Sequence, residues 1–120
     1  KEFNLKQCFF GEHILKYEPG ISVAIVESER TAIICYTHFP EYIWLAAGSL
    51  HGLSIEKCKV LKGREVVLFP DLGKGYEIWE KKAVEIRQAL GLNLKVNYFL
   101  AQEASADHCE GLDLADYINR

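Results

Sequence analysis

The sequence predicts an α/β domain with a mainly parallel, four-stranded sheet and helices on both of its faces. Three observations lead to this fold class. Four short apolar runs recur along the 120 residues, segments of helical character separate them, and 49% of the residues are hydrophobic while 26% are charged. That composition suffices to bury the core of one domain. A strand–helix–strand order requires crossover connections, which bring successive strands into a parallel sheet.

The predicted strands are continuous apolar runs rather than alternating ones. Runs of β-branched and aromatic residues are typical of strands that are buried on both faces. Turn residues bound three of the runs: Pro19-Gly20 precedes the first, Pro40 and Gly48 flank the second, and Pro70 closes the third. The four predicted strands span residues 21–26, 42–47, 66–69 and 96–100.

The predicted helices lie between these runs. In the clearest one, apolar residues recur every three or four positions and Gly91 supplies a stop signal. Ser54 is the expected N-cap of a shorter helix. The predicted helices span residues 7–16, 29–38, 54–61 and 76–90, with a closing turn or short helix at 113–118.

Charge and cysteine usage narrow the class of protein. The chain has 14 basic and 17 acidic residues, a net charge of −3, which excludes a generally basic nucleic-acid-binding protein but leaves a local binding face open. The four cysteines lie far apart without a C-x-x-C pair, which argues against a structural zinc site and for a reducing compartment. Cys35 and Cys58 are expected to be buried. No apolar run approaches the roughly 20 residues of a membrane span. We therefore expect a cytoplasmic domain, and the start at Lys1 without any methionine indicates a part of a larger protein.

Carboxylates recur where the predicted strands end. Glu27 follows the first strand and Asp71 the third, and sites in open parallel sheets form beyond the carboxyl ends of the strands. If these two strands are neighbours, both carboxylates meet at one edge and offer the hard oxygen ligands that Mg²⁺ prefers. Two structural roles compete with this interpretation: Glu27 could cap the following helix, and Asp71 could begin a Pro-Asp turn.

Other signals are weaker. Gly73-Lys74-Gly75 lacks the spacing of a phosphate-binding loop, and no G-x-G-x-x-G follows the first strand. His51, in a loop of small residues, either touches a phosphate or is a solvated loop histidine. The basic cluster that begins at Lys57 is either a phosphate-facing patch or the charged end of a helix. The candidate nucleic-acid-binding residues are Lys57, Lys62, Arg64 and Lys74.

Several segments together resemble the Toprim domain of bacterial primases and topoisomerases. Residues 26–32 are similar to the motif in which a glutamate follows strand one, residues 44–49 to the primase Ala-x-x-Gly segment, and residues 66–75 stand in the place of Asp-x-Asp-x-x-Gly. Residues 10–13 resemble the aromatic-Gly helix before primase Toprim domains, and residues 111–117 the Asp-x-x-Asp tail. The closest resemblance is to the primase-like Toprim proteins of Bacteroides-like bacteria and their mobile elements.

The resemblance implies one Toprim-like domain over residues 1–120, with Rossmann-like layering. It also implies Mg²⁺-dependent phosphodiester chemistry on nucleic acid, with Mn²⁺ as a substitute ion. By position, Glu27 takes the role of general acid/base and Asp71 that of a metal ligand. The second aspartate position holds Gly73, and Thr31 stands where primases often have an aspartate.

These departures leave the activity open. Either Asp113 or Asp116 compensates as a metal ligand, or the domain is a weakened relative. The leading hypothesis is therefore a nucleotidyl-transferring domain of a DNA primase-like or mobile-element protein, beside a zinc-binding module or a helicase. The alternative is a catalytically degenerate Toprim that binds nucleic acid or a replication partner. A third class, a nucleotide- or small-molecule-binding domain unrelated to Toprim, predicts that Glu27 and Asp71 lie far apart in the sheet.

Overall fold

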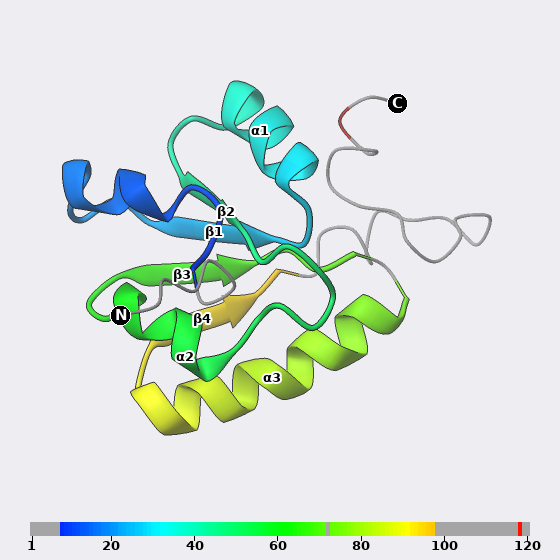
Figure 1. Cartoon of the computed structure of the whole chain (residues 1–120). Coiled ribbons are helices and arrows are strands. Elements are labelled where there is room, and N and C mark those ends of the chain that lie inside the picture. Colours follow the sequence, from blue (N-terminus) through cyan, green and yellow to red (C-terminus); the bar gives the residue numbers. More distant parts are fainter. Residues whose placement is uncertain (1–7, 72, 98–117, 119–120) are drawn as a thin grey trace, which may run out of the picture.

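The computed structural model describes residues 8–71, 73–97 and 118. Within these residues, strands and helices alternate as the sequence predicts (Figure 1). Two short segments are 3-10 helices, which we label η. The elements in chain order are η2 (Glu12–Tyr17), β1 (Val23–Val26), α1 (Glu29–His38), β2 (Ile43–Ala46), α2 (Ile55–Cys58), η3 (Lys59–Leu61), β3 (Glu65–Leu68), α3 (Lys74–Leu90) and β4 (Asn93–Val96).

The four strands form one parallel sheet in the order β2-β1-β3-β4. Ile25 in β1 pairs with Leu45 in β2 on one side and with Leu68 in β3 on the other. The chain therefore runs outward from β1 to β2 and then crosses back past β1 to β3. This reversal of direction places a topological switch point between β1 and β3.

Helices cover both faces of the sheet, which confirms the predicted layering: α1 lies on one face, α2 and α3 on the other (Figure 1). Alternate residues of one strand enter different cores, because successive side chains of a strand point to opposite faces. In β1, Val23 and Ile25 belong to the core under α3, whereas Ala24 and Val26 belong to the core under α1.

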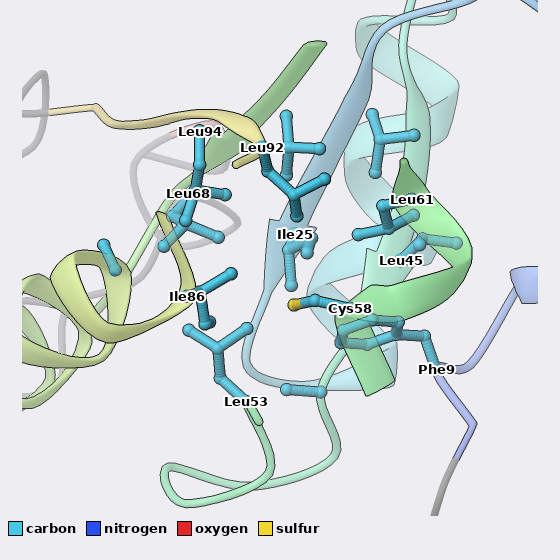
Figure 2. Packing of buried hydrophobic residues seen from close by; sticks show 14 of the residues in the cluster. Phe9, Ile25, Leu45, Leu53, Cys58, Leu61, Leu68, Ile86, Leu92 and Leu94 are labelled. Carbon is cyan, nitrogen blue, oxygen red and sulfur yellow. The ribbon is translucent and has the colours of Figure 1, made fainter. Parts of the chain in front are cut away.

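The larger core packs the apolar stripe of α3 onto the central strands. Trp79, Ala83 and Ile86 recur at helical spacing and are at most 1% exposed, so this face of α3 is a buried one. Figure 2 shows the packing, with the Cys58 side chain inside the cluster. Cys35 is buried on the opposite face, so both thiols are core residues as predicted.

The predicted position of the fourth strand is wrong. The strand runs over Asn93–Val96, whereas the sequence predicts 96–100, of which residues 98–100 lie outside the described part. As the last strand of the described sheet, β4 is buried on one face only. Leu94 is buried while Asn93 and Lys95 are exposed, so the strand lacks the continuous apolar run by which the other three were recognised.

The helix predictions hold with shifted ends. The helix predicted over 29–38 is α1, Ser54 caps α2 through its hydroxyl, and Gly91 ends α3 with φ 68°. Of the segment predicted as a helix over 7–16, residue 7 lies outside the described residues and residues 12–16 belong to the 3-10 helix η2, which begins after a left-handed Gly11. Of the predicted closing helix, only Ile118 lies within the described residues, packed against the core under α1. No helix among the described residues is both long and apolar enough to cross a bilayer.

Candidate functional site

Glu27 and Asp71 lie at the topological switch point. Glu27 directly follows β1, and Asp71 comes three residues after the end of β3. The two strands are hydrogen-bonded neighbours, and the ladder continues beyond them, since the Phe69 amide donates to the Ile25 carbonyl oxygen at 2.9 Å. Both acidic residues are half-buried and lie at the same, carboxyl edge of the sheet. The expectation of the third function class, that the sheet separates them, is not met.

Glu27 is not the cap of α1. The N-cap is Ser28, whose hydroxyl oxygen accepts a hydrogen bond of 3.1 Å from the Thr31 amide and lies 2.8 Å from the Thr31 hydroxyl oxygen. The backbone of Glu27 is held separately, because the Gly48 amide donates to its carbonyl oxygen at 2.8 Å. The helix therefore does not need the Glu27 carboxylate as its cap.

Thr31 and Gly73, the two departures from the Toprim pattern, both have structural roles. Thr31 is 1% exposed and completes the cap of α1 together with Ser28. Gly73 precedes α3 with φ 89° and ψ −134°, a conformation that side-chain-bearing residues rarely adopt. An aspartate at position 73 would strain this turn, so the turn explains the glycine there.

Asp71 lies against the first turn of α3. A Cβ atom placed on Gly75 would be 3.6 Å from the Cβ of Asp71, an ordinary van der Waals distance. A methyl group at position 75 would therefore fit between this turn and the end of β3. Besides this packing contact, Asp71 takes part in a polar or ionic interaction within the protein.

The predicted metal site is incomplete in the described residues. These contain no group of three or more His, Cys, Asp or Glu side chains that could hold an ion. Asp113 and Asp116 lie outside the described part of the chain. Glu27 and Asp71 are therefore the two predicted site residues that the sheet brings together.

The candidate nucleic-acid-binding residues differ in how far their side chains are exposed to solvent. Lys57 is only 9% exposed, and Arg64 donates to three backbone carbonyl oxygens, so neither side chain is a freely solvated surface group. Lys62 and Lys74 are exposed. The four candidates thus differ in exposure, and their role in binding nucleic acid stays a prediction.

A pocket of about 740 Å³ opens beyond the carboxyl end of β2. Its walls are formed by the backbone at the end of β2, by the small-residue loop that follows, by the segment before η2 and by the start of α2. The polar side chains that line it are Cys8, Glu29, Ser49, His51, Ser54 and Lys57. Its aromatic wall is made by Phe9, which is buried, and Phe10, which is 39% exposed.

Lys57 is the functional candidate whose environment the sequence analysis missed. Its ammonium donates a hydrogen bond of 2.9 Å to the Ala47 carbonyl oxygen and lies 5.5 Å from the centroid of the Phe9 ring. A signal for this burial is present in the sequence, because Leu53, Lys57 and Leu61 recur at four-residue spacing and both leucines are core residues.

Burial shifts two pKa values in this segment. Desolvation lowers the pKa of Lys57, since the charged form loses hydration, and nearby Cys8, Cys58 and Glu12 partly oppose this shift. Desolvation also raises the pKa of Cys58 to about 12, because there the charged form is the thiolate, and the Lys57 charge partly opposes it. Cys58 is therefore a protonated core thiol at neutral pH.

Comparison with known proteins identifies a family for this chain. A family model described as Domain of unknown function (DUF6371) matches residues 1–72 of the 120 residues, a range that contains Glu27, Lys57 and Asp71. Neither the curated proteins nor the solved structures contain a match to the chain.

Proposed function

The chain belongs to the DUF6371 family, and we propose from its own geometry that it is a Toprim-like domain that binds nucleic acid and acts on phosphodiesters with Mg²⁺. The reaction class proposed is nucleotidyl transfer, as in primase-like and mobile-element proteins. DNA is the proposed nucleic acid, the cytoplasm the proposed location, and a zinc-binding module or a helicase the proposed neighbouring domains.

One observation carries the proposal: Glu27 and Asp71 end neighbouring parallel strands on either side of the topological switch point. In open α/β sheets, ligands bind in the crevice at this point, because the connections leave it in opposite directions and open a space between them. Two carboxylates in such a crevice supply oxygen ligands rather than a hydrophobic wall.

The residues at the switch point fit Mg²⁺. This ion is usually held by one or two protein carboxylates and completes its shell with water and substrate phosphates. Asp71 would hold it, with Asp113 or Asp116 as proposed further ligands. Bound there, the ion would supply the positive charge that phosphate oxygens need and that a chain of net charge −3 lacks overall.

Glu27 would act as the general acid/base. A carboxylate at this position can accept the proton of an attacking hydroxyl, which makes the oxygen a better nucleophile, and can return it to a leaving oxygen. The Glu27 backbone is held by β1 on one side and by the Gly48 amide on the other, and this fixed backbone supports the proposed role. The exposed Lys62 and Lys74 remain the proposed contacts to nucleic-acid phosphates.

The metal proposal is tested by titrating Mg²⁺ into the chain and following backbone and side-chain NMR signals. We expect millimolar Mg²⁺ to shift signals at positions 27 and 71, and Asp71→Asn to weaken the response strongly. Glu41→Gln is the matched control, because Glu41 is an exposed carboxylate before β2, at the opposite edge of the sheet. Absence of shifts at Glu27 and Asp71 would contradict the metal site.

A catalytically degenerate Toprim is the second candidate, and the conformation of Gly73 favours it. The turn there disfavours an aspartate at position 73, the second of the Toprim motif, so a ligand that the resemblance implies is missing. An extension assay on a DNA template with Mg²⁺ or Mn²⁺ separates the two candidates. Product formation that Glu27→Gln abolishes supports the enzyme, whereas DNA binding without product supports the binding module.

A further inference from the structure

We propose that the pocket beyond the carboxyl end of β2 is a phosphate-binding site, in which Lys57, Ser49 and His51 hold the phosphate group of a nucleotide or a nucleic-acid strand. The inference goes beyond the metal chemistry and stands without it, because neither Glu27 nor Asp71 lines this pocket.

The charge of Lys57 is the first argument. Its side chain is buried, yet Ala47 offers it only a neutral carbonyl oxygen, and Phe9 only a ring face. Among the described residues, no carboxylate oxygen lies within ion-pair distance of the ammonium. A buried cation is costly unless an anion and hydrogen bonds compensate it. An anion in the adjoining pocket would supply that compensation.

The direction of the Lys57 pKa agrees with this argument. Desolvation lowers that pKa, as expected where the groups around the amine replace only part of its hydration. Cys8, Cys58 and Glu12 are the ionisable groups that act in the other direction. A dianionic phosphate beside the ammonium would favour the charged form and move the pKa back upward.

Free hydrogen-bond donors next to Lys57 are the second argument. Ser49 and His51 lie in the loop after β2 and line the same pocket. In the described part of the chain, neither the Ser49 hydroxyl nor the His51 ring has a hydrogen-bond partner. An ammonium, a hydroxyl and an imidazole around one space suit a group with several acceptor oxygens, which is what phosphate presents.

The dimensions and walls of the pocket favour a nucleotide over a bare ion. Its volume of about 740 Å³ lies in the range of small-molecule sites. The half-exposed ring of Phe10 provides an apolar surface on which a base can stack. Glu29 also lines the pocket, but it is exposed in the first turn of α1, where solvent screens its charge.

The position of the pocket connects it to the switch point. The loop that carries Ser49 and His51 begins at Gly48, whose amide donates to the Glu27 carbonyl oxygen. A nucleic-acid strand with one phosphodiester near Glu27 could therefore place a neighbouring phosphate in the pocket. A free nucleotide could occupy it as well, and the two sources share the same recognition chemistry.

The experiment measures binding of three probes by NMR titration in a buffer that contains a chelator, so that no divalent ion takes part. The probes are inorganic phosphate, adenosine monophosphate and a short oligothymidylate. We expect signals of the 48–52 loop and of Lys57 to shift with at least one phosphate ester at millimolar concentration. Stronger binding of the monophosphate indicates a nucleotide site. Stronger binding of the oligonucleotide indicates a site for the phosphates of a nucleic-acid strand.

Variants assign the binding to the named groups. Lys57→Met keeps the length of the side chain and removes the charge, so we expect about a tenfold or greater loss of affinity. Ser49→Ala and His51→Ala change exposed loop residues and should each weaken binding several-fold without unfolding the chain. Lys81→Met removes the same charge from the exposed side of α3 and should leave affinity unchanged.

Two results would overturn the phosphate site. One is the absence of shifts in the 48–52 loop with all three probes. The other is an affinity that Ser49→Ala and His51→Ala leave at the level of the Lys81→Met control. Either result leaves the metal proposal intact, because the chelator excludes the ion from this experiment, and a failed Mg²⁺ titration leaves the phosphate site intact in turn.

Discussion

The guanidinium of Arg64 donates a hydrogen bond of 2.6 Å to the carbonyl oxygen of Leu15, a residue 49 positions earlier in η2. The same group donates to the carbonyl oxygens of Glu18 and Ile21, each at 3.0 Å. One side chain from the turn before β3 thus holds the whole segment that leads from η2 into β1. Its guanidinium therefore stabilises the backbone of that segment.

Arg64→Lys is therefore expected to lower the stability of the chain. A lysine keeps the charge but cannot span three carbonyl oxygens, so at least one charge-assisted hydrogen bond is lost, at a cost of about 2 kcal/mol. Urea unfolding followed by circular dichroism measures the loss. The affinity for DNA should be unchanged. If the affinity for DNA falls while the stability stays constant, Arg64 contacts DNA instead.

Gly52→Ala is expected to disturb the β2–α2 loop. A Cβ atom at position 52 would lie 2.2 Å from the Ala47 carbonyl oxygen, which is the acceptor for Lys57. Relief of this clash requires the backbone to move, so we expect a loss of about 2 kcal/mol or more and weaker phosphate binding. Thermal unfolding and the phosphate titration measure the two effects.

Gly75→Ala is the matched control for that substitution. The nearest atoms to a Cβ at position 75 are 3.6 Å away, and the residue has a helical conformation in α3. Alanine should fit there and raise stability by about 0.5 kcal/mol, because it restricts the unfolded chain more than glycine does. Equal destabilisation by both substitutions would show that contact with Ala47 is not what matters at position 52.

Cys58 should make the stability of the chain fall at alkaline pH. The folded-state pKa of its thiol, about 12, lies above the ordinary value of 9.0. The stabilising contribution is therefore fully present below pH 9 and is lost as the pH rises toward 12. Between pH 8 and pH 10, the unfolding free energy should drop by about 1.4 kcal/mol through this group alone.

Cys58→Ala isolates that contribution. The variant will be less stable at every pH because it leaves a cavity in the core, so the informative quantity is the difference in pH dependence between the two proteins. Urea unfolding at pH 8 and pH 10 gives this difference. Parallel pH dependence of the two proteins would mean that the Cys58 thiol ionises as readily in the folded chain as in the unfolded one.

Ser28→Ala should cost about 1 kcal/mol, the usual effect of removing an N-cap acceptor. Ser28→Asp retains an acceptor for the Thr31 amide and should stay close to the original stability. Chemical denaturation of both variants measures the effect. If both lose the same stability, the hydroxyl contact with Thr31, rather than the cap of α1, is the important interaction.

The success of the strand predictions depended on burial. β1 and β2 are covered on both faces, so their sequences are continuous apolar runs and were located within two residues. β4 is covered on one face, and Leu94 alternates there with the exposed Asn93 and Lys95. The sequence-based prediction instead placed the strand on the apolar run that follows, residues 96–100. The predictions for the candidate site residues also depended on burial. The sequence places Glu27 and Asp71 at strand ends because strand ends are local features, but it leaves the Lys57 cluster as either a phosphate-facing patch or a charged helix end and does not predict that Lys57 is buried.

By itself, the sequence determined the alternation of strands and helices, the caps at Ser54 and Gly91, and the carboxylates at two strand ends, because these depend on periodicity and on contacts within a few residues. Only the tertiary structure decided the strand order that makes β1 and β3 neighbours and the burial of Lys57 against Ala47. Both depend on contacts between distant segments, and the free energy of those contacts comes from packing against the whole core rather than from any local pattern.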